Sequence, residues 1–396
     1  MAHAADDERP DEVWDAAVVG AGPAGAAAAL RLARLGRRVV LLDHRRRGKT
    51  CGGGLTAESL RLLDGLGVGD AVRRMAHPTG DLSVFSASGT EVRVRGTFLT
   101  VERAAFDATL AQAAIGAGAV FRQACVDAVE PLTDGTVRLE LTGCPRPARA
   151  RFAVLATGAS ARLARGLGMM DARRPSGVAV RCIVRSTLSL NRMVAAYLPY
   201  LLPGYGWVFP LGDGAFNVGC AAFEPWRGTN LAAAFQRFTR QFLVARELIE
   251  AAEAVPPLEG GILRCGFHGV RRFVVDRVVG VGETVGSTLP LTGEGIGMAL
   301  ATAGMAAEAI EEALASDDLG ELRAYPARVA RELRPRHLGL RIAQSAASVG
   351  WLNDLVARQA REGRWLHGTV AAAVTDRQPP RAVRGLRRLV RWLAGP

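Results

Sequence analysis

A cysteine lies inside a glycine-rich segment near the start of the chain. Residues 49–55 read Lys-Thr-Cys-Gly-Gly-Gly-Leu, so three glycines follow Cys51 directly. Glycine carries no side chain, and the backbone can therefore approach a flat ligand closely. A thiol at such a place can donate a proton, help to orient the ligand, or pack as a small apolar group. Lys49 is the only lysine of the chain, and its expected partner is either a phosphate or solvent.

The elements that position this segment begin with a strand, a turn and a helix. Residues 16–19 are apolar and predict a short strand. Residues 20–25 read Gly-Ala-Gly-Pro-Ala-Gly and open an alanine-rich helix that extends to about Leu35. Residues 38–43 predict the next strand, which ends on an acid. This order is that of a dinucleotide-binding unit.

The glycines of this unit have separate tasks. Gly20 allows the tight turn, Gly22 brings the backbone close to a pyrophosphate, and Gly25 permits close packing of helix on strand. The helix N-terminus offers unpaired N–H groups to the phosphates. Asp43 lies 21 residues after Gly22 and can accept a ribose hydroxyl. These residues predict a bound dinucleotide.

Two later segments extend the same unit. Residues 101–107 begin a helix in which Arg103 can hold phosphates or ribityl oxygens. Residues 152–159 predict a buried strand that ends in a turn. Both are expected in the lobe that binds the dinucleotide.

A third segment adds a second glycine-lined helix start. Residues 278–282 predict a strand, Glu283 follows, and residues 293–297 read Gly-Glu-Gly-Ile-Gly before an alanine-rich helix to about Ala315. The positive end of this helix would favour the anionic reduced form of a flavin ring.

These segments together resemble the FAD-dependent oxidoreductases of the aromatic-hydroxylase type, and within them the geranylgeranyl reductase family. Residues 49–55 and residues 203–210 carry the closer resemblance, because the second segment is similar to that family's YxWxFP element. The resemblance covers about residues 13–330. It implies reduction of isolated double bonds in prenyl chains by hydride transfer from reduced flavin.

The resemblance also implies roles for individual residues. Cys51 would border the flavin, either as a catalytic residue or as a contact only. Tyr205, Trp207 and Phe209 would line the substrate cavity. The residues implied in FAD binding are Gly20, Gly22, Ala24, Gly25, Asp43, Cys51, Gly52, Gly54, Arg103, Val126, Glu283, Gly295 and Ile296.

Two departures from related flavoproteins concern the electron donor and the ribityl contact. Thr157 stands where many flavin hydroxylases have aspartate, which weakens a prediction of direct reduction by NADPH. NAD(P)H, ferredoxin or a separate reductase protein therefore all stay open as electron donors. Glu283 replaces the usual aspartate, and its longer side chain can still accept a hydroxyl hydrogen bond.

Two rival classes fit part of the pattern. A flavin-dependent monooxygenase or halogenase acting on an aromatic or polyketide compound would share the nucleotide unit. The halogenase element WxWxIP is not present, since residues 205–210 read Tyr-Gly-Trp-Val-Phe-Pro. A non-catalytic flavin-binding partner is the second rival, and the intact flavin motifs argue against it.

The expected fold is α/β, with a Rossmann-type FAD-binding domain, an inserted mixed or antiparallel β-sheet domain and a helical C-terminus. Residues 126–142 predict a hairpin, and residues 231–252 predict one helix over the second sheet. The predicted segments are FAD-binding parts 13–75, 99–165 and 266–330, a β-hairpin insertion 76–98, a substrate-binding sheet 166–265 and a helical region 331–396.

Composition limits the class of protein and its surroundings. Six widely spaced cysteines without a CxxC pair indicate a reducing cytosol. An acidic start without an apolar run argues against a signal peptide. The longest uncharged run, 193–212, contains three prolines and predicts strands and turns rather than a membrane span. Metal-ligand spacing is not present among the histidines and cysteines, so no metal is expected.

The net charge of +12 raises the question of an anionic partner. No nucleic-acid-binding pattern accompanies the charge, so nucleic acid is not expected. Residues 381–393 alternate arginines with apolar residues and a tryptophan, as in a helix lying on a membrane surface. A last helix docked on the body of the protein is the alternative. We therefore expect a cytoplasmic protein with a hydrophobic small-molecule or lipid substrate, and peripheral membrane contact through residues 381–393 stays open beside the docked helix.

Overall fold

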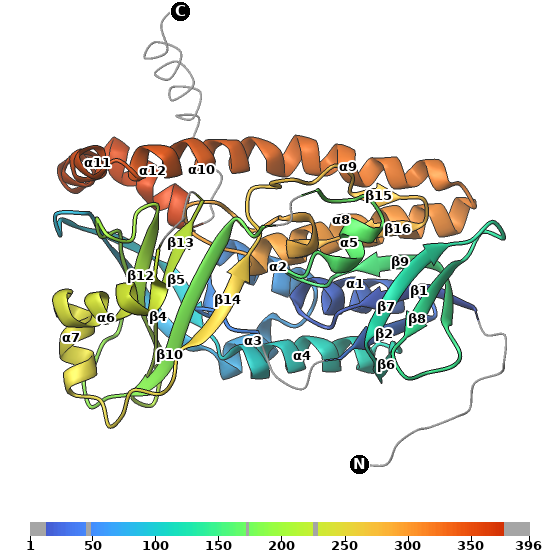
Figure 1. Ribbon diagram of the computed structural model, residues 1–396, viewed down its shortest axis with the longest axis horizontal. Helices are drawn as coiled ribbons and strands as arrows, with labels where there is room; N and C mark the ends of the chain where they lie inside the picture. Colours follow the sequence, from blue (N-terminus) through green and yellow to red (C-terminus); the bar gives the residue numbers. More distant parts are fainter. Residues whose placement is uncertain (1–12, 45–48, 172–173, 225–228, 376–396) are drawn as a thin grey trace, which may run out of the picture.

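Two eight-stranded sheets form the frame of the molecule, and helices cover their outer sides (Figure 1). The computed structural model describes residues 13–44, 49–171, 174–224 and 229–375. The expected α/β class, the second sheet and the helical C-terminal region are all confirmed. Residues 381–393, the predicted basic helix, lie outside the described residues.

The first sheet has a parallel core that begins with the predicted nucleotide unit. Its main order is β15-β16-β9-β1-β2-β6, and the hairpin of β7 and β8 joins it at β9. Apolar side chains fill both faces of its central strands, which explains their uninterrupted runs of valine, alanine and leucine. The strands are β1 Val13–Val19, β2 Val39–Asp43, β6 Val120–Gln123, β7 Val126–Pro131, β8 Val137–Leu141, β9 Ala148–Leu155, β15 Val274–Val275 and β16 Val278–Gly280.

Helices α1 (Pro23–Arg34), α4 (Arg103–Gly116) and α8 (Ile296–Ser316) pack together on one face of this sheet. The alanines of α1 are all buried, and their small side chains let the helices approach closely. A methyl group on Gly25 would lie 1.7 Å from the Gly20 carbonyl oxygen and 3.0 Å from the Ala156 Cβ atom, so glycine at this position permits the close packing of helix on strand that the sequence predicted. The helix predicted to end near Ala315 ends at Ser316.

The second sheet is mixed, because β11 pairs with β4 in parallel while its other pairs are antiparallel. Its order is β14-β10-β13-β12-β11-β4-β5-β3. The uncharged run 193–212 forms two strands of this sheet, as expected. The strands are β3 Gly54–Leu55, β4 His77–Phe85, β5 Glu91–Thr100, β10 Gly177–Arg185, β11 Met193–Ala196, β12 Gly204–Gly212, β13 Ala215–Phe223 and β14 Glu259–Leu263.

The prediction of one continuous helix over residues 231–252 is wrong. The segment 231–252 forms two helices, α6 (Leu231–Gln241) and α7 (Leu243–Glu250), on the outer face of the second sheet. Phe242 leaves the helical conformation between them, with φ −85° and ψ 115°. Its ring packs edge-on against Phe85 at 5.1 Å and stacks on Phe238 at 5.5 Å. Tertiary packing of one aromatic ring thus overrides local helix preference.

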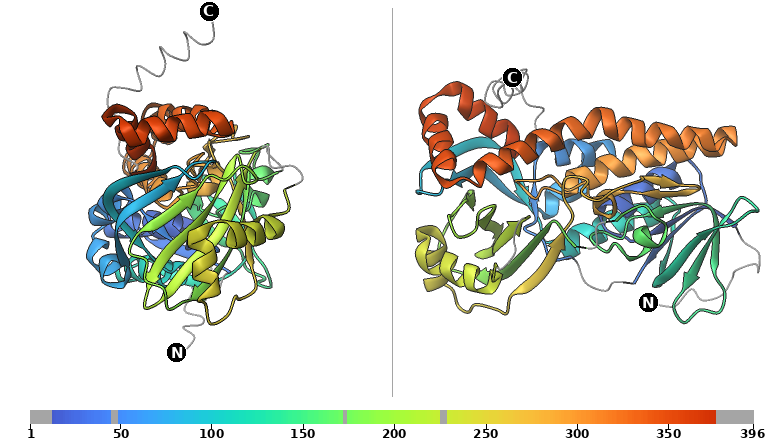
Figure 2. Two further views of the ribbon diagram at one scale, coloured as in Figure 1. Left: turned by 90° about the vertical axis from the view of Figure 1, so that its left-hand side faces the viewer. Right: turned by 45° about the horizontal axis from the view of Figure 1, so that its top comes forward.

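The C-terminal helices lie along one side of both sheets, and α11 and α12 pack on β5 (Figure 2). In the described part of the chain, no helix is both long and apolar enough to cross a membrane. The remaining helices are α2 Ala57–Gly65, α3 Gly69–Met75, α5 Arg162–Gly166, η1 Gly282–Val285, η2 Leu319–Arg323, α9 Ala324–Arg328, the π-helical η3 Val329–Leu333, α10 Arg334–Ala347, α11 Gly350–Glu362 and α12 Arg364–Thr375.

Candidate functional site

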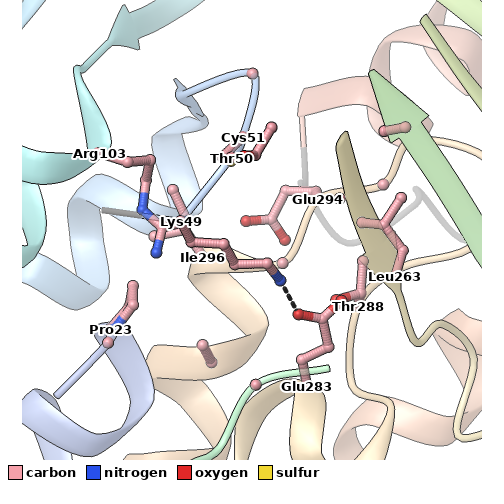
Figure 3. A pocket seen from close by; sticks show the side chains of 18 of the residues that line it. Pro23, Lys49, Thr50, Cys51, Arg103, Leu263, Glu283, Thr288, Glu294 and Ile296 are labelled. Carbon is pink, nitrogen blue, oxygen red and sulfur yellow. Dashed lines mark hydrogen bonds and ion pairs between the residues drawn. The ribbon is translucent and has the colours of Figure 1, made fainter. Parts of the chain in front are cut away.

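A deep cavity lies between the two sheets and collects nearly all predicted site residues (Figure 3). Gly25 is the exception, since it packs inside the turn. The predicted residues that line the cavity are Gly20, Gly22, Ala24, Asp43, Cys51, Gly52, Gly54, Arg103, Val126, Tyr205, Trp207, Phe209, Glu283, Gly295 and Ile296.

One end of the cavity is the open N-terminus of α1. Gly22 is the N-cap residue and has no side chain to satisfy the first N–H groups, and the first turn holds no acid. A methyl group on Gly22 would meet nothing within 4 Å, so the backbone here faces open space. Gly20 has φ +104° and its Cβ would lie 2.3 Å from the Ala156 carbonyl oxygen. Asp43 Oδ2 accepts a hydrogen bond from Ala21 N at 2.6 Å, which fixes the acid beside the turn.

An ion pair crosses the middle of the cavity. Lys49 donates to Glu283 Oε2, and Glu283 Oε1 accepts from Arg264 N at 3.0 Å (Figure 3). The side chains of Lys49 and Glu283 are 23% and 10% exposed, so solvent screens the pair only in part. Neither expectation for Lys49 included this partner. The pair sets an ammonium and a carboxylate side by side, where diphosphate oxygens and ribityl hydroxyls need such groups.

Cys51 follows Lys49 by two residues and is tied to the second sheet, because its carbonyl oxygen accepts a hydrogen bond from a side chain on β13. Its Sγ atom accepts a hydrogen bond from Gly53 N at 3.4 Å, and the buried Arg103 guanidinium lies beside it. Arg103 is held by Asp107 through two hydrogen bonds of 2.9 and 2.8 Å. Burial alone lowers the pKa of Arg103, but Asp107 and Cys51 outweigh it and raise that pKa above its usual value. The arginine therefore stays charged next to the thiol.

Asn217 on β13 is a site residue that the sequence analysis missed. Its Nδ2 donates to the carbonyl oxygens of Cys51 (2.8 Å) and Gly52 (3.1 Å). Its Oδ1 accepts from Trp207 Nε1 at 3.0 Å, and the residue is 3% exposed. One buried amide thus joins the glycine-rich segment to the second sheet. No local pattern marks it, because its partners on that segment lie 165 and 166 residues away.

Three alternate residues of β12 form an aromatic wall opposite Cys51. Tyr205, Trp207 and Phe209 point to one face, as successive odd positions of a strand must. Neighbouring rings are 6.0 and 6.3 Å apart. A methyl group on Gly52 would lie 3.2 Å from the Phe209 ring, so the glycine-rich segment and the wall are in close contact.

Two tyrosines connect the second sheet to the loop before α8. Tyr197 Oη donates to the Leu291 carbonyl oxygen at 3.1 Å, and Tyr205 Oη donates to the Thr292 carbonyl oxygen. Burial raises the pKa of both phenols well above the ordinary value. Both tyrosines are therefore neutral hydrogen-bond donors that hold the loop in place.

The residues present fit an FAD molecule. The open start of α1 and Lys49 suit the diphosphate, and Asp43 and Glu283 suit the ribose and ribityl hydroxyls. The glycines after Cys51 let a flat ring lie against the backbone. Val126 lines the cavity, and its carbonyl oxygen accepts a hydrogen bond from Arg162 at 2.5 Å. No cluster of three metal-binding side chains occurs among residues that the structure describes.

Comparison with known families agrees with this fit. A family model described as FAD binding domain matches residues 14–327. The fold and the site thus define a flavoprotein whose cofactor is FAD.

Relatives that match over most of their length identify the family within the FAD-binding flavoproteins. Digeranylgeranylglycerophospholipid reductase 1 of Methanopyrus kandleri is 31% identical over 336 residues, which cover 81% of this chain and 87% of the relative. Menaquinone reductase of Mycobacterium tuberculosis is 32% identical over 351 residues, covering 79% of each chain. The chain belongs to the geranylgeranyl reductase family of FAD-dependent oxidoreductases.

Solved structures share the fold. A geranylgeranyl bacteriochlorophyll reductase-like protein of Thermoplasma acidophilum superposes with a TM-score of 0.79 at 21% identity, covering 89% of this chain and 92% of that one. The flavin-dependent brominase Bmp2 has a TM-score of 0.76 at 17% identity, covering 96% and 99%. At these identities the likeness concerns the fold alone.

Proposed function

We propose that this protein saturates C=C bonds in a polyprenyl chain carried by a lipid, a quinone or a related metabolite. The observation that carries the proposal is the aromatic wall of Tyr205, Trp207 and Phe209, which lines the same cavity as the glycine-rich segment and contacts that segment at Gly52. Relatives named for the reduction of lipids and quinones support it. Reduced FAD supplies the hydride in such chemistry.

The chain's own residues orient the substrate and exclude water. An isolated alkene has no carbonyl to polarise, so placement and a dry cavity provide much of the rate. The aromatic faces also stabilise positive charge that develops on carbon. Cys51 is the proposed catalytic residue of the glycine-rich segment. The residues that the sequence predicted to bind FAD are proposed to hold the cofactor. The domain boundaries predicted from the sequence are retained as part of this proposal.

The electron donor is proposed to be NAD(P)H or a ferredoxin-type protein. Thr157 replaces the aspartate that many flavin hydroxylases have at this position, which favours delivery of the electrons by a separate protein. Steady-state assays with each donor, with and without added ferredoxin and its reductase, distinguish the two.

Contact with a lipid bilayer is proposed for a cytoplasmic protein that takes its substrate from the membrane. Besides residues 381–393, exposed apolar side chains on α10, on α11 and in the turn between them support this contact, with exposed arginines such as Arg341 and Arg358 on the same helices. These apolar residues are Leu338, Ile342, Val349, Trp351 and Leu355, exposed to 52%, 37%, 41%, 68% and 42%.

Liposome sedimentation tests this contact. Full-length protein should sediment with anionic vesicles, and removal of residues 379–396 or the change Trp351→Ser should reduce sedimentation. Equal binding by all three forms would exclude both surfaces.

The function is tested by product analysis without oxygen. Purified protein is reduced anaerobically with dithionite and mixed with geranylgeranyl compounds, and the products are analysed by mass spectrometry. A gain of two hydrogens per turnover is expected. Reaction only in air, with insertion of an oxygen or a halogen atom, would instead establish the monooxygenase or halogenase alternative.

A further inference from the structure

The sheet face that forms one wall of the cavity is charged at one edge and apolar at the other. Residues that pair directly on neighbouring strands have their side chains on the same face. One row of such residues starts on the edge strand β14 and crosses β10, β13, β12 and β11 to β4 (Figure 1). The row consists of Glu259, Arg181, Gly219, Trp207, Ala195 and Val84. Its members that line the cavity are Arg181, Trp207, Ala195 and Val84.

The apolar end of the row lies in the interior of the protein. Leu82, Phe98 and Met193 near this end are buried, belong to one hydrophobic cluster and line the cavity. Val374 of α12 packs against the same cluster and lines the cavity as well. This end therefore suits a hydrocarbon chain.

Arg181 forms the charged end of the row. Its side chain is 12% exposed, whereas that of Glu259 is 57% exposed, so the row reaches solvent at β14. Arg181 Nη2 lies 2.9 Å from Glu259 Oε2, and this is the only ion pair of the arginine in the part of the chain that the structure describes. A guanidinium has five N–H groups, and one carboxylate satisfies only part of them.

Stability alone does not explain an arginine at this position. Burying most of a charged side chain is costly, and an ion pair with a mostly exposed carboxylate returns little of that free energy. The Nε atom of Arg181 is buried and has no hydrogen-bond partner, so the surrounding protein does not saturate the guanidinium. The accessible part of the side chain borders the cavity, where a ligand can supply further acceptors.

The charged end lies close to the aromatic wall and to the glycine-rich segment. A methyl group on Gly219 would lie 2.3 Å from the Trp207 ring, so the indole covers Gly219 on the side of β10. Neighbouring strands are about 4.8 Å apart, which places Arg181 about 10 Å from Trp207 across the sheet. Thr50 Oγ1 donates to Glu259 Oε2 at 3.5 Å, so the glycine-rich segment reaches the same edge.

We propose that Arg181 binds the anionic head group of the prenyl substrate, an inference that rests on the proposed reductase function. The substrate lies across the strands, with a phosphate-type head at β10 beside the solvent edge and its chain running past Trp207 toward β4. The planar guanidinium donates two parallel hydrogen bonds to phosphate oxygens. Arg181 thus selects a phosphate-bearing prenyl compound over a neutral quinone or alcohol.

Ligand binding to the oxidised, FAD-loaded, full-length protein tests this inference without turnover. Geranylgeranyl diphosphate and geranylgeraniol share one chain and differ in the head group, and tryptophan fluorescence gives their dissociation constants. Wild type should bind the diphosphate about tenfold or more tightly than the alcohol. Arg181→Gln should lose most of this difference, while its affinities for the alcohol and for FAD stay close to wild type.

Two further variants separate the guanidinium from the ion pair. Glu259→Gln breaks the same ion pair from the other side and should keep the preference for the diphosphate. Arg181→Lys retains the charge and should keep part of the preference. Equal losses in Arg181→Gln and Glu259→Gln would overturn the proposal, because the ion pair would then be what matters.

Inorganic diphosphate distinguishes a lipid head group from a free anion. It lacks the chain and should bind far more weakly than geranylgeranyl diphosphate. Binding of both with the same affinity would overturn the proposal, because the site would then take a free anion. A loss of FAD affinity in Arg181→Gln with an unchanged head-group preference would overturn it too, because the arginine would then belong to the cofactor site.

The outcomes separate this inference from the proposed function. Wild type that binds the diphosphate and the alcohol equally, yet forms saturated product anaerobically, overturns the role of Arg181 and leaves the reductase function standing. Wild type that saturates no prenyl compound refutes the proposed function, and the inference about its substrate with it.

Discussion

The change Asn217→Ala tests how the glycine-rich segment is held against the second sheet. It removes the three hydrogen bonds that join Asn217 to Trp207, Cys51 and Gly52. The buried Trp207 Nε1–H then has no acceptor, which costs about 1–3 kcal/mol. The carbonyl groups of Cys51 and Gly52 belong to half-buried residues, so water can replace each lost bond at about 0.5–1 kcal/mol. We expect the free energy of unfolding to fall by about 2–5 kcal/mol.

The same change should weaken FAD binding by about tenfold, because Cys51 and Gly52 lose their fixed position. Urea unfolding measures the stability and flavin fluorescence quenching measures the dissociation constant. Asn230→Ala is the matched control, since Asn230 caps α6 outside the cavity through a 3.1 Å hydrogen bond to Ala233 N. It should cost about 1 kcal/mol and leave FAD affinity unchanged.

A double-mutant cycle with Trp207→Phe identifies the source of the stability loss. In the Trp207→Phe background no indole N–H remains to be orphaned, so Asn217→Ala should cost about 1–3 kcal/mol less than in wild type. An equal cost in both backgrounds would refute the reasoning. If Asn217→Ala binds FAD as tightly as wild type, the idea that Asn217 positions Cys51 and Gly52 for FAD binding is refuted.

Three further changes probe the cavity and its frame. Lys49→Met removes the ion-pair partner of Glu283, which still accepts a hydrogen bond from Arg264 N, and should weaken FAD binding by about tenfold or more, with partial rescue by Glu283→Gln; unchanged affinity in fluorescence titration would count against the pair. Cys51→Ala should retain FAD yet lose most turnover in the anaerobic assay, and full activity rejects its catalytic role. Burial lowers the pKa of His337 below its usual 6.5. The unfolded chain therefore takes up this proton first as pH falls below 6.5, stability declines there, and urea titrations of His337→Gln should show a smaller decline.

Local patterns predicted the parts of the fold that depend on neighbours in the sequence. The turn at Gly20 and Gly22, the acid at Asp43 and the alternation along 205–209 each follow from strand and helix periods over a few residues. The expected helix over 231–252 failed at Phe242, because a ring contact with Phe85 decides the backbone there.

The parts of the site that escaped prediction are contacts between distant segments. Lys49 and Glu283 lie 234 residues apart, and Ser59 and Glu294 lie 235 residues apart. Residue types alone marked neither pair. In the sequence, Glu294 is one member of a glycine-rich helix start, and only the structure shows its hydrogen bonds to Ser59 and Gly297. Asn217 looked like an ordinary strand residue between apolar neighbours.

The most direct test of the reductase account is anaerobic reoxidation of the flavin by substrate. The FAD-loaded protein is reduced with one equivalent of dithionite and mixed in a stopped-flow cell with a geranylgeranyl lipid or menaquinone. The account predicts that the oxidised flavin spectrum returns without oxygen, with one double bond saturated per flavin. A flavin that stays reduced with all such substrates, and is reoxidised only when oxygen is admitted, would contradict it.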